Sequence, residues 1–185
     1  MDSKSTAIHA KLLSPGQTEL HNFHKQAPSS SSLAARIEAA PPGTFVILFP
    51  DAEAVQLHEL PVEELAAMRA VIVIDGTWSQ AAAINRTPPF CTLRKIRLDP
   101  SLRTAFWRYQ SLGPHCLSTI EAIYYFMREV TRIRRGERDK ETGLDDLLYF
   151  FSFFYHLIQD SYASTPERKF TTRHRHDYIQ RQNKE

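Results

Sequence analysis

The chain has 185 residues, of which 42% are hydrophobic and 24% charged, and these values suit one globular domain with a core of its own. The formal net charge of +2 excludes a protein that binds nucleic acid through strong overall charge, so a nucleic-acid partner would need a local basic patch. Cys91 and Cys116 lack the paired spacing of a zinc site or a disulfide framework. The first residues are polar, and the longest apolar stretch, 147–158, is too short to span a bilayer. We therefore expect a soluble protein that is not secreted and not membrane-bound.

A polar lead-in at 3–28 precedes the predicted regular elements, and we expect it to be irregular apart from a short apolar piece at 10–13. Glycine, proline and serine clusters separate the segments that follow. In chain order the predicted elements are helix 33–40, strand 45–49, helix 62–68, strand 71–74, helix 78–85, strand 92–98, helix 118–135 and helix 144–163.

Strands 45–49 and 71–74 are continuous apolar runs, a pattern typical of strands that are buried on both faces in a parallel sheet. Their alternation with helices predicts an α/β fold with a mostly parallel sheet and flanking helices. We expect one domain over residues 1–163 and a basic, flexible tail over 164–185.

The motif Asp75-Gly76-Thr77-Trp78 follows a predicted buried strand directly and precedes a helix. Ligands in open α/β sheets bind beyond the carboxyl ends of the strands, so Asp75 is a candidate proton acceptor there. Gly76 permits a tight turn and close backbone approach, and Trp78 offers a flat surface for a base. The alternative is structural: Asp75 or Thr77 caps the helix and Trp78 belongs to the core.

A second motif, Ser118-Thr119-Ile120-Glu121-Ala122, begins the long helix predicted at 118–135. Ser118 and Glu121 match the S-x-x-E capping box, which is a purely structural explanation. The helix N-terminus can also hold an anion such as a carboxylate, and the two roles are compatible.

Basic and aromatic residues alternate between the two motifs and beyond the second one. The set comprises Arg94, Lys95, Arg97 and Arg103, then Phe106, Trp107, Arg108 and Tyr109, and later Arg128, Arg132, Arg134, Arg135, Arg138 and Lys140. Such a surface can bind RNA by phosphate contacts and base stacking, although charge runs are usually solvated faces.

Two other patterns carry less weight. The pairs His21/His24 and His174/His176 have metal-like spacing, but no carboxylate or thiol set completes a site, so we predict no metal. The aromatic stripe of the last helix is predicted to be helix core; it consists of Tyr149, Phe150, Phe153, Phe154 and Leu157.

The two motifs together resemble the signatures of the DTW-domain family. The segments 4–13, 106–108, 117–126 and 145–148 resemble the eukaryotic DTW domain-containing protein 1 branch of that family, so the resemblance runs from about residue 3 to about residue 160. It implies a single SPOUT-related domain, possibly including the knot of that fold. It also implies that S-adenosylmethionine donates its 3-amino-3-carboxypropyl group to N3 of a uridine in the tRNA D-loop, at position 20. The products implied are acp3U and methylthioadenosine.

From the reaction that the resemblance implies, we predict roles for individual residues. Asp75 is the predicted general base for N3. Gly76, Thr77 and Trp78 are predicted to shape the cofactor or uridine pocket. Ser118 and Thr119 are predicted to hold the carboxylate of the donor, and Glu121 its ammonium. Lys11, Arg94 and Arg108 are the predicted phosphate contacts on tRNA.

One departure from the family concerns metal. Relatives carry a cysteine-rich, zinc-binding stretch upstream of the segment at 4–13, and this sequence has none of those cysteines, so no zinc site is carried over. Two alternatives remain: a SPOUT-like RNA methyltransferase, and a non-catalytic RNA-binding relative. The resemblance implies no obligate protein partner, and it places the protein in the nucleus or the cytosol.

Overall fold

The computed structural model describes residues 5–23, 32–106, 113, 115–135 and 143–164. Its three strands, β1 (Phe45–Leu48), β2 (Ala70–Val73) and β3 (Arg94–Ile96), form one sheet in the order β2-β1-β3. Both pairings are parallel. The predicted mixture of helices and strands around a parallel sheet is therefore confirmed in the described part of the chain.

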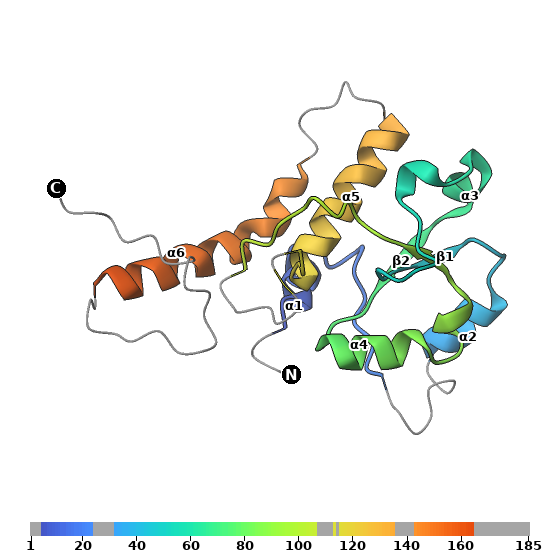
Figure 1. Cartoon of the computed structure of the whole chain (residues 1–185), viewed down its shortest axis with the longest axis horizontal. Helices are drawn as coiled ribbons and strands as arrows, with labels where there is room; N and C mark the ends of the chain where they lie inside the picture. The colour runs from blue at the N-terminus through green and yellow to red at the C-terminus, as the bar shows by residue number, and fades with distance from the viewer. Residues whose placement is uncertain (1–4, 24–31, 107–112, 114, 136–142, 165–185) are drawn as a thin grey trace.

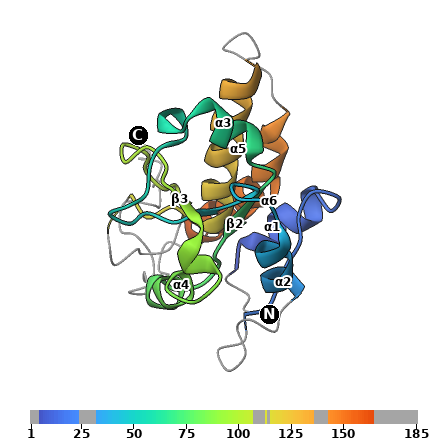
Figure 2. The same ribbon diagram turned by 90° about the vertical axis from the view of Figure 1, so that its right-hand side faces the viewer.

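Helices flank the sheet on both sides. They are α1 (Ala7–Leu13), α2 (Ser32–Ala39), α3 (Val62–Ala67), α4 (Trp78–Asn85), α5 (Thr119–Arg135) and α6 (Tyr149–Ala163), with 3₁₀ turns η2 (Leu57–Glu59), η3 (Phe90–Thr92) and η4 (Leu144–Leu148). Figures 1 and 2 show α3 and α5 on one side of the strands and α2 and α4 on the other. The sheet is thus the middle layer of the molecule.

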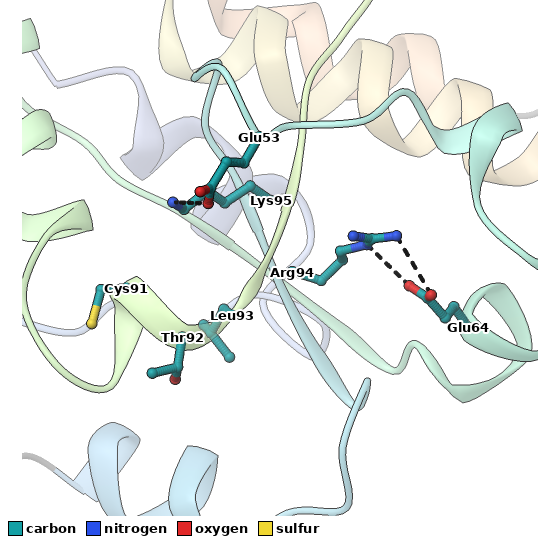
Figure 3. Close-up of a pocket in the computed structure, with 7 residues that line it drawn as sticks. All are labelled: Glu53, Glu64, Cys91, Thr92, Leu93, Arg94 and Lys95. Carbon is teal, nitrogen blue, oxygen red and sulfur yellow. Dashed lines mark hydrogen bonds and ion pairs between the residues drawn. The ribbon is translucent and has the colours of Figure 1, made fainter.

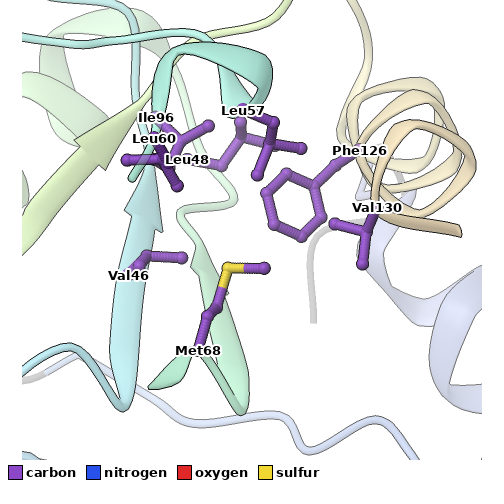
Figure 4. Close-up of a cluster of buried hydrophobic side chains, with 8 residues drawn as sticks. All are labelled: Val46, Leu48, Leu57, Leu60, Met68, Ile96, Phe126 and Val130. Carbon is purple, nitrogen blue, oxygen red and sulfur yellow. The ribbon is translucent and has the colours of Figure 1, made fainter. Parts of the chain in front are cut away.

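Successive side chains of β1 enter different clusters, which explains its unbroken apolar run. Val46 and Leu48 pack in a cluster with Leu57, Leu60, Met68, Ile96, Phe126 and Val130 (Figure 4). Ile47 is fully buried on the opposite face, in a cluster with Ile37 and Phe90. Because neighbouring residues of a strand point to opposite faces, a sheet covered on both sides needs apolar residues throughout.

Three predicted boundaries need correction. The lead-in was expected to be irregular apart from a short apolar piece at 10–13, but α1 forms over Ala7–Leu13, with His9 and Ala10 buried. A helix of this length is marginal by itself, so its contacts with α5 and η4 hold it in place. The predicted third strand, 92–98, shortens to Arg94–Ile96 because η3 takes up its start. The predicted helix 144–163 divides into η4 and α6.

The aromatic stripe of α6 was predicted to be core, and that prediction is wrong. Tyr149 is 61% exposed, Phe153 52%, Phe154 38% and Leu157 52%. The buried residues of this helix are Phe151 and Tyr162 instead. Its apolar residues lie all around the helix, so their spacing does not show which side packs, and Figure 1 shows α6 projecting away from the sheet.

Other expectations about the fold stay predictions, namely the SPOUT relation, the knot, and the division into a domain at 1–163 and a tail at 164–185. Residues 165–185 lie outside the described part. No described helix combines the length and the apolar composition that crossing a membrane requires.

Candidate active site

A cleft of about 1330 Å³ lies at the carboxyl ends of the three strands. Its walls include residues 49–51 after β1, 74–78 after β2 and 97–99 after β3. Residues 117–119, at the start of α5, and Ser5 and Thr6 also line it. The parallel sheet therefore gathers residues from distant parts of the sequence at one edge, as such sheets do at ligand sites.

Asp75 and Thr119 join the two sequence motifs. The Thr119 hydroxyl donates a hydrogen bond of 2.5 Å to Asp75 Oδ1, across 44 residues of sequence. Asp75 is exposed at the end of β2, and Thr119 is the first residue of α5. The hydrogen bond holds the carboxylate in a defined direction at the wall of the cleft.

Glu121 is the centre of a buried hydrogen-bond network. Its Oε2 accepts from the Ser118 amide at 2.8 Å, and from the hydroxyls of Ser118 and Thr104 at 2.7 Å each. Its Oε1 accepts from the Ala105 amide at 2.8 Å. The side chain does not line the cleft. The predicted contact with the donor's ammonium stays a prediction, and the geometry favours a positioning role that ties residues 104–106 to the start of α5.

Only one of the two hydrogen bonds of the predicted capping box forms at the start of α5. Glu121 reaches back to the Ser118 amide, but the Ser118 hydroxyl donates to Glu121 instead of accepting from the helix. Thr6 fills that place, since its hydroxyl accepts from the Ile120 amide at 3.1 Å in a buried position. Sequence reasoning missed Thr6 as a site residue, because a cap supplied from 114 positions away leaves no local signal.

The start of α4 confirms part of the structural alternative. Thr77 is the N-cap, and it forms a capping box with Gln80 while also lining the cleft. Trp78 is half-buried rather than core, with its ring 6.4 Å from that of Phe49. Gly76 has no positive φ, so its backbone conformation does not itself require glycine. The roles of these residues toward a cofactor or uridine stay predictions.

A second acidic residue of the cleft, Asp51, is paired within the protein. Lys95 Nζ lies 2.9 Å from Asp51 Oδ2, and the Glu53 amide donates to Oδ1 at 3.0 Å. Burial by itself raises the pKa of Asp51, but these hydrogen bonds and the Lys95 charge outweigh it, so its pKa lies below the ordinary value. Asp51 is thus held as a carboxylate with its charge compensated.

The two predicted RNA contacts that the structure describes, Lys11 and Arg94, lie apart from the cleft wall. Lys11 Nζ donates to the carbonyls of Pro15 and Thr18, which holds the turn after α1. Arg94 lines a separate hollow of about 380 Å³ and pairs with Glu64 at 3.1 Å (Figure 3). Arg108, Trp107 and Tyr109 lie outside the described residues. Contacts of these residues with RNA stay predictions.

Two arginines of the predicted basic segment do reach the cleft, namely Arg97 and Arg103. Sequence reasoning counted them in the basic segment and did not assign them to the site. The strand-end argument used for Asp75 would have found Asp51 after the predicted strand 45–49, but not Arg97, which lies inside the predicted strand 92–98 and follows β3 only in the structure.

The histidines in the described part of the chain form no metal cluster. His21 hydrogen-bonds Glu19 at 3.0 Å, while His24, His174 and His176 lie outside the described residues. Within the described ranges, no group of three or more histidine, cysteine, aspartate or glutamate side chains is placed to hold a metal ion.

Comparison with known proteins identifies the family. The model of the DTW domain matches residues 2–159. The chain belongs to the DTW-domain family. It is 33% identical over 202 residues to tRNA-uridine aminocarboxypropyltransferase 1 of Mus musculus, covering 91% of this chain and 65% of that protein. The Homo sapiens protein of the same name is 32% identical over 198 residues, with 88% and 63% covered.

A more distant relative shares a shorter segment. It is tRNA-uridine aminocarboxypropyltransferase 2 of Mus musculus, 34% identical over 77 residues, with 41% of this chain and 26% of that protein covered. The chain spans about 65% of the length of the first relative above. No solved structure matches it.

Proposed function

We propose that this DTW-family chain transfers the 3-amino-3-carboxypropyl group of S-adenosylmethionine to N3 of a uridine in the tRNA D-loop. The target is position 20 by resemblance, and the products are acp3U and methylthioadenosine. The names of the relatives support the reaction class and the tRNA substrate. The hydrogen bond between Thr119 and Asp75 carries the proposal, because it joins both family motifs at the wall of a cleft large enough for a nucleoside donor and a base.

The cleft residues fit the donor on chemical grounds. S-adenosylmethionine supplies an electrophilic carbon, whose bond to sulfur breaks as its bond to N3 forms and leaves a neutral thioether. A sulfonium leaving group needs no metal, so the chain's own task is to orient the reactants and to remove the N3 proton. Trp78 and Phe49 offer aromatic surface in the cleft for adenine or uracil.

Asp75 accepts the N3 proton as general base, and Thr119 orients it. A base must lie within hydrogen-bonding reach of the proton that it removes, and Asp75 is exposed to the cleft. Its Oδ1 is occupied by Thr119. No hydrogen bond of the described residues occupies Oδ2, which leaves this oxygen for the substrate.

The hydroxyls at the start of α5 already donate hydrogen bonds within the protein, and their contact with the donor carboxylate stays a prediction. Ser118 and Thr119 were predicted to hold the donor carboxylate, but their hydroxyls donate to Glu121 and Asp75. Of these two carboxylates, Asp75 lines the cleft and Glu121 does not, and the charge of Asp75 favours the sulfonium. Lys11, Arg94 and Arg108 remain the proposed phosphate contacts.

The same resemblance extends the proposal to fold ancestry and location. The parallel sheet with helices on both faces supports a relation to SPOUT methyltransferases. We also place the protein in the nucleus or the cytosol on the resemblance alone.

Mass spectrometry of nucleosides tests the proposed function. Unmodified tRNA is incubated with the purified chain and S-adenosylmethionine, and the released cofactor product is followed in parallel. The expected result is aminocarboxypropyl-uridine together with methylthioadenosine. A methylated base with S-adenosylhomocysteine would establish the methyltransferase instead, and tRNA binding without product or cofactor affinity would establish the non-catalytic relative.

A further inference from the structure

Arg97 has a buried guanidinium nitrogen without a partner. The residue follows β3, where its amide donates to the Val55 carbonyl at 2.9 Å, and it lines the cleft. Its Nε is inaccessible to solvent and makes no hydrogen bond. The two Nη groups of Arg97 also make no hydrogen bond but are not buried to this extent, so they are the donors that an acceptor in the cleft can reach.

Three neighbouring cations of the described part of the chain are engaged by the protein. Lys95 pairs with Asp51, and Arg94 pairs with Glu64. Arg103, which also lines the cleft, donates to the carbonyls of Pro100 and Leu102. Among the described residues, Arg97 has no side-chain hydrogen bond or ion pair, so its terminal Nη donors remain available to an anion in the cleft.

The opposite charge lies at another part of the same cleft. Asp75 stands after β2 with Thr119 bonded to it. A donor with a cationic sulfonium and an anionic carboxylate can therefore meet charges of both signs. The planar fork of arginine matches a carboxylate with two parallel hydrogen bonds, which lysine cannot supply.

We propose that Arg97 binds the carboxylate of the amino acid group of S-adenosylmethionine and so determines which carbon faces the uridine. This inference rests on the proposed function, since it assumes that the cleft holds this donor. Transfer of the aminocarboxypropyl group requires that this group be fixed with its reacting carbon toward N3, and a contact with the carboxylate contributes to that orientation.

Equilibrium binding of two ligands to the full chain tests the assignment without turnover. S-adenosylhomocysteine carries the carboxylate, and methylthioadenosine lacks the whole amino acid group. In Arg97→Gln we expect the affinity for S-adenosylhomocysteine to fall about tenfold or more, because charge-assisted hydrogen bonds are lost. The affinity for methylthioadenosine stays at the wild-type value.

Two further variants make the comparison specific. Arg97→Lys keeps the charge but removes the fork, and we expect an intermediate loss for S-adenosylhomocysteine. Arg86→Gln removes an exposed charge outside the cleft and should change neither affinity. Thermal unfolding of each variant shows that the fold is intact, and Arg97→Lys carries the test if Arg97→Gln does not fold.

Three results would overturn the inference. Equal weakening of both ligands would make Arg97 a residue that shapes the cleft. Unchanged affinity for both, with weaker and less salt-dependent tRNA binding, would assign Arg97 to a backbone phosphate. Unchanged affinity for both and for tRNA would leave Arg97 no ligand. If the wild type binds neither ligand, the proposed function itself fails, and the inference fails with it.

Discussion

The residues around the strand-end cleft are held by hydrogen bonds, whereas helix α6 is held by apolar packing. At the cleft, Asp75 is held by a hydrogen bond from Thr119, 44 residues away, and Glu121, behind the cleft wall, is held by one from Thr104. In α6, one side packs on the body through Phe151, while large aromatic side chains such as Phe153 remain exposed. Polar groups with fixed directions are what catalysis requires, so the difference identifies the cleft as the place to look for chemistry.

The largest expected change in the free energy of unfolding distinguishes the buried side of α6 from its exposed side. Phe151 is 7% exposed and stacks near Phe106, whereas Phe153 is 52% exposed. Phe151→Ala should lower the free energy of unfolding by about 3–5 kcal/mol, because it leaves a cavity. Phe153→Ala should cost less than about 1 kcal/mol. Urea unfolding of the two variants measures both, and equal losses would mean that the exposed side of α6 is packed after all.

The next largest expected effect on stability concerns the hydrogen-bond network of Glu121 beneath the cleft. Glu121→Ala leaves the amides of Ala105 and Ser118 without their acceptor, and should lower the free energy of unfolding by about 3 kcal/mol. Glu129→Ala is the matched control on the same helix, because Glu129 makes only a 3.7 Å ion pair with His58. Its cost should stay below about 1 kcal/mol. Urea unfolding measures both variants. Similar losses of unfolding free energy would contradict the view that the Glu121 network stabilises the protein more than an ordinary surface pair does.

The smallest expected effect is a pH dependence of the free energy of unfolding, caused by His9 where α1 meets α6. The His9 ring lies 5.7 Å from that of Phe150 and 6.0 Å from that of Phe154, and burial lowers the pKa of His9 below its ordinary value. The unfolded chain therefore takes up a proton at a higher pH than the folded chain does. The stability that His9 contributes is present above about pH 6.5 and is lost as the pH falls below it.

His9→Phe should flatten this dependence. Unfolding at pH 7 and pH 5 measures the slope in the wild type and the variant. His58→Gln, which changes a half-exposed histidine elsewhere, should keep the wild-type slope. Identical slopes in all three proteins would show that His9 does not titrate differently in the folded state.

Local patterns predicted the layers and one wall of the site. The apolar runs around Ile47 and Ile72 identified buried parallel strands, because burial on both faces leaves no room for alternation. The position of Asp75 after such a strand then followed from the geometry of parallel sheets. The sequence did not predict which side of α6 packs on the body, because the aromatic residues of this helix lie all around it.

The other parts of the site depend on contacts between residues that are distant in the sequence, so local patterns could not predict them. The cap from Thr6 to Ile120 and the hydrogen bond from Thr104 to Glu121 join segments with no local pattern in common. The open donor of Arg97 also depends on what its neighbours bind, because Arg94 and Lys95 look the same in sequence but are paired in the structure.

The most direct test of the cleft as the site of transfer is the single-turnover rate of Asp75→Asn on tRNA with S-adenosylmethionine. The rate should fall by about a hundredfold or more, because a general base is lost. Binding of S-adenosylhomocysteine and the unfolding temperature should stay near their wild-type values. Glu63→Gln, at an exposed position of α3, should retain the wild-type rate. A wild-type rate in Asp75→Asn would contradict the account, because the carboxylate at the end of β2 would then take no part in the reaction.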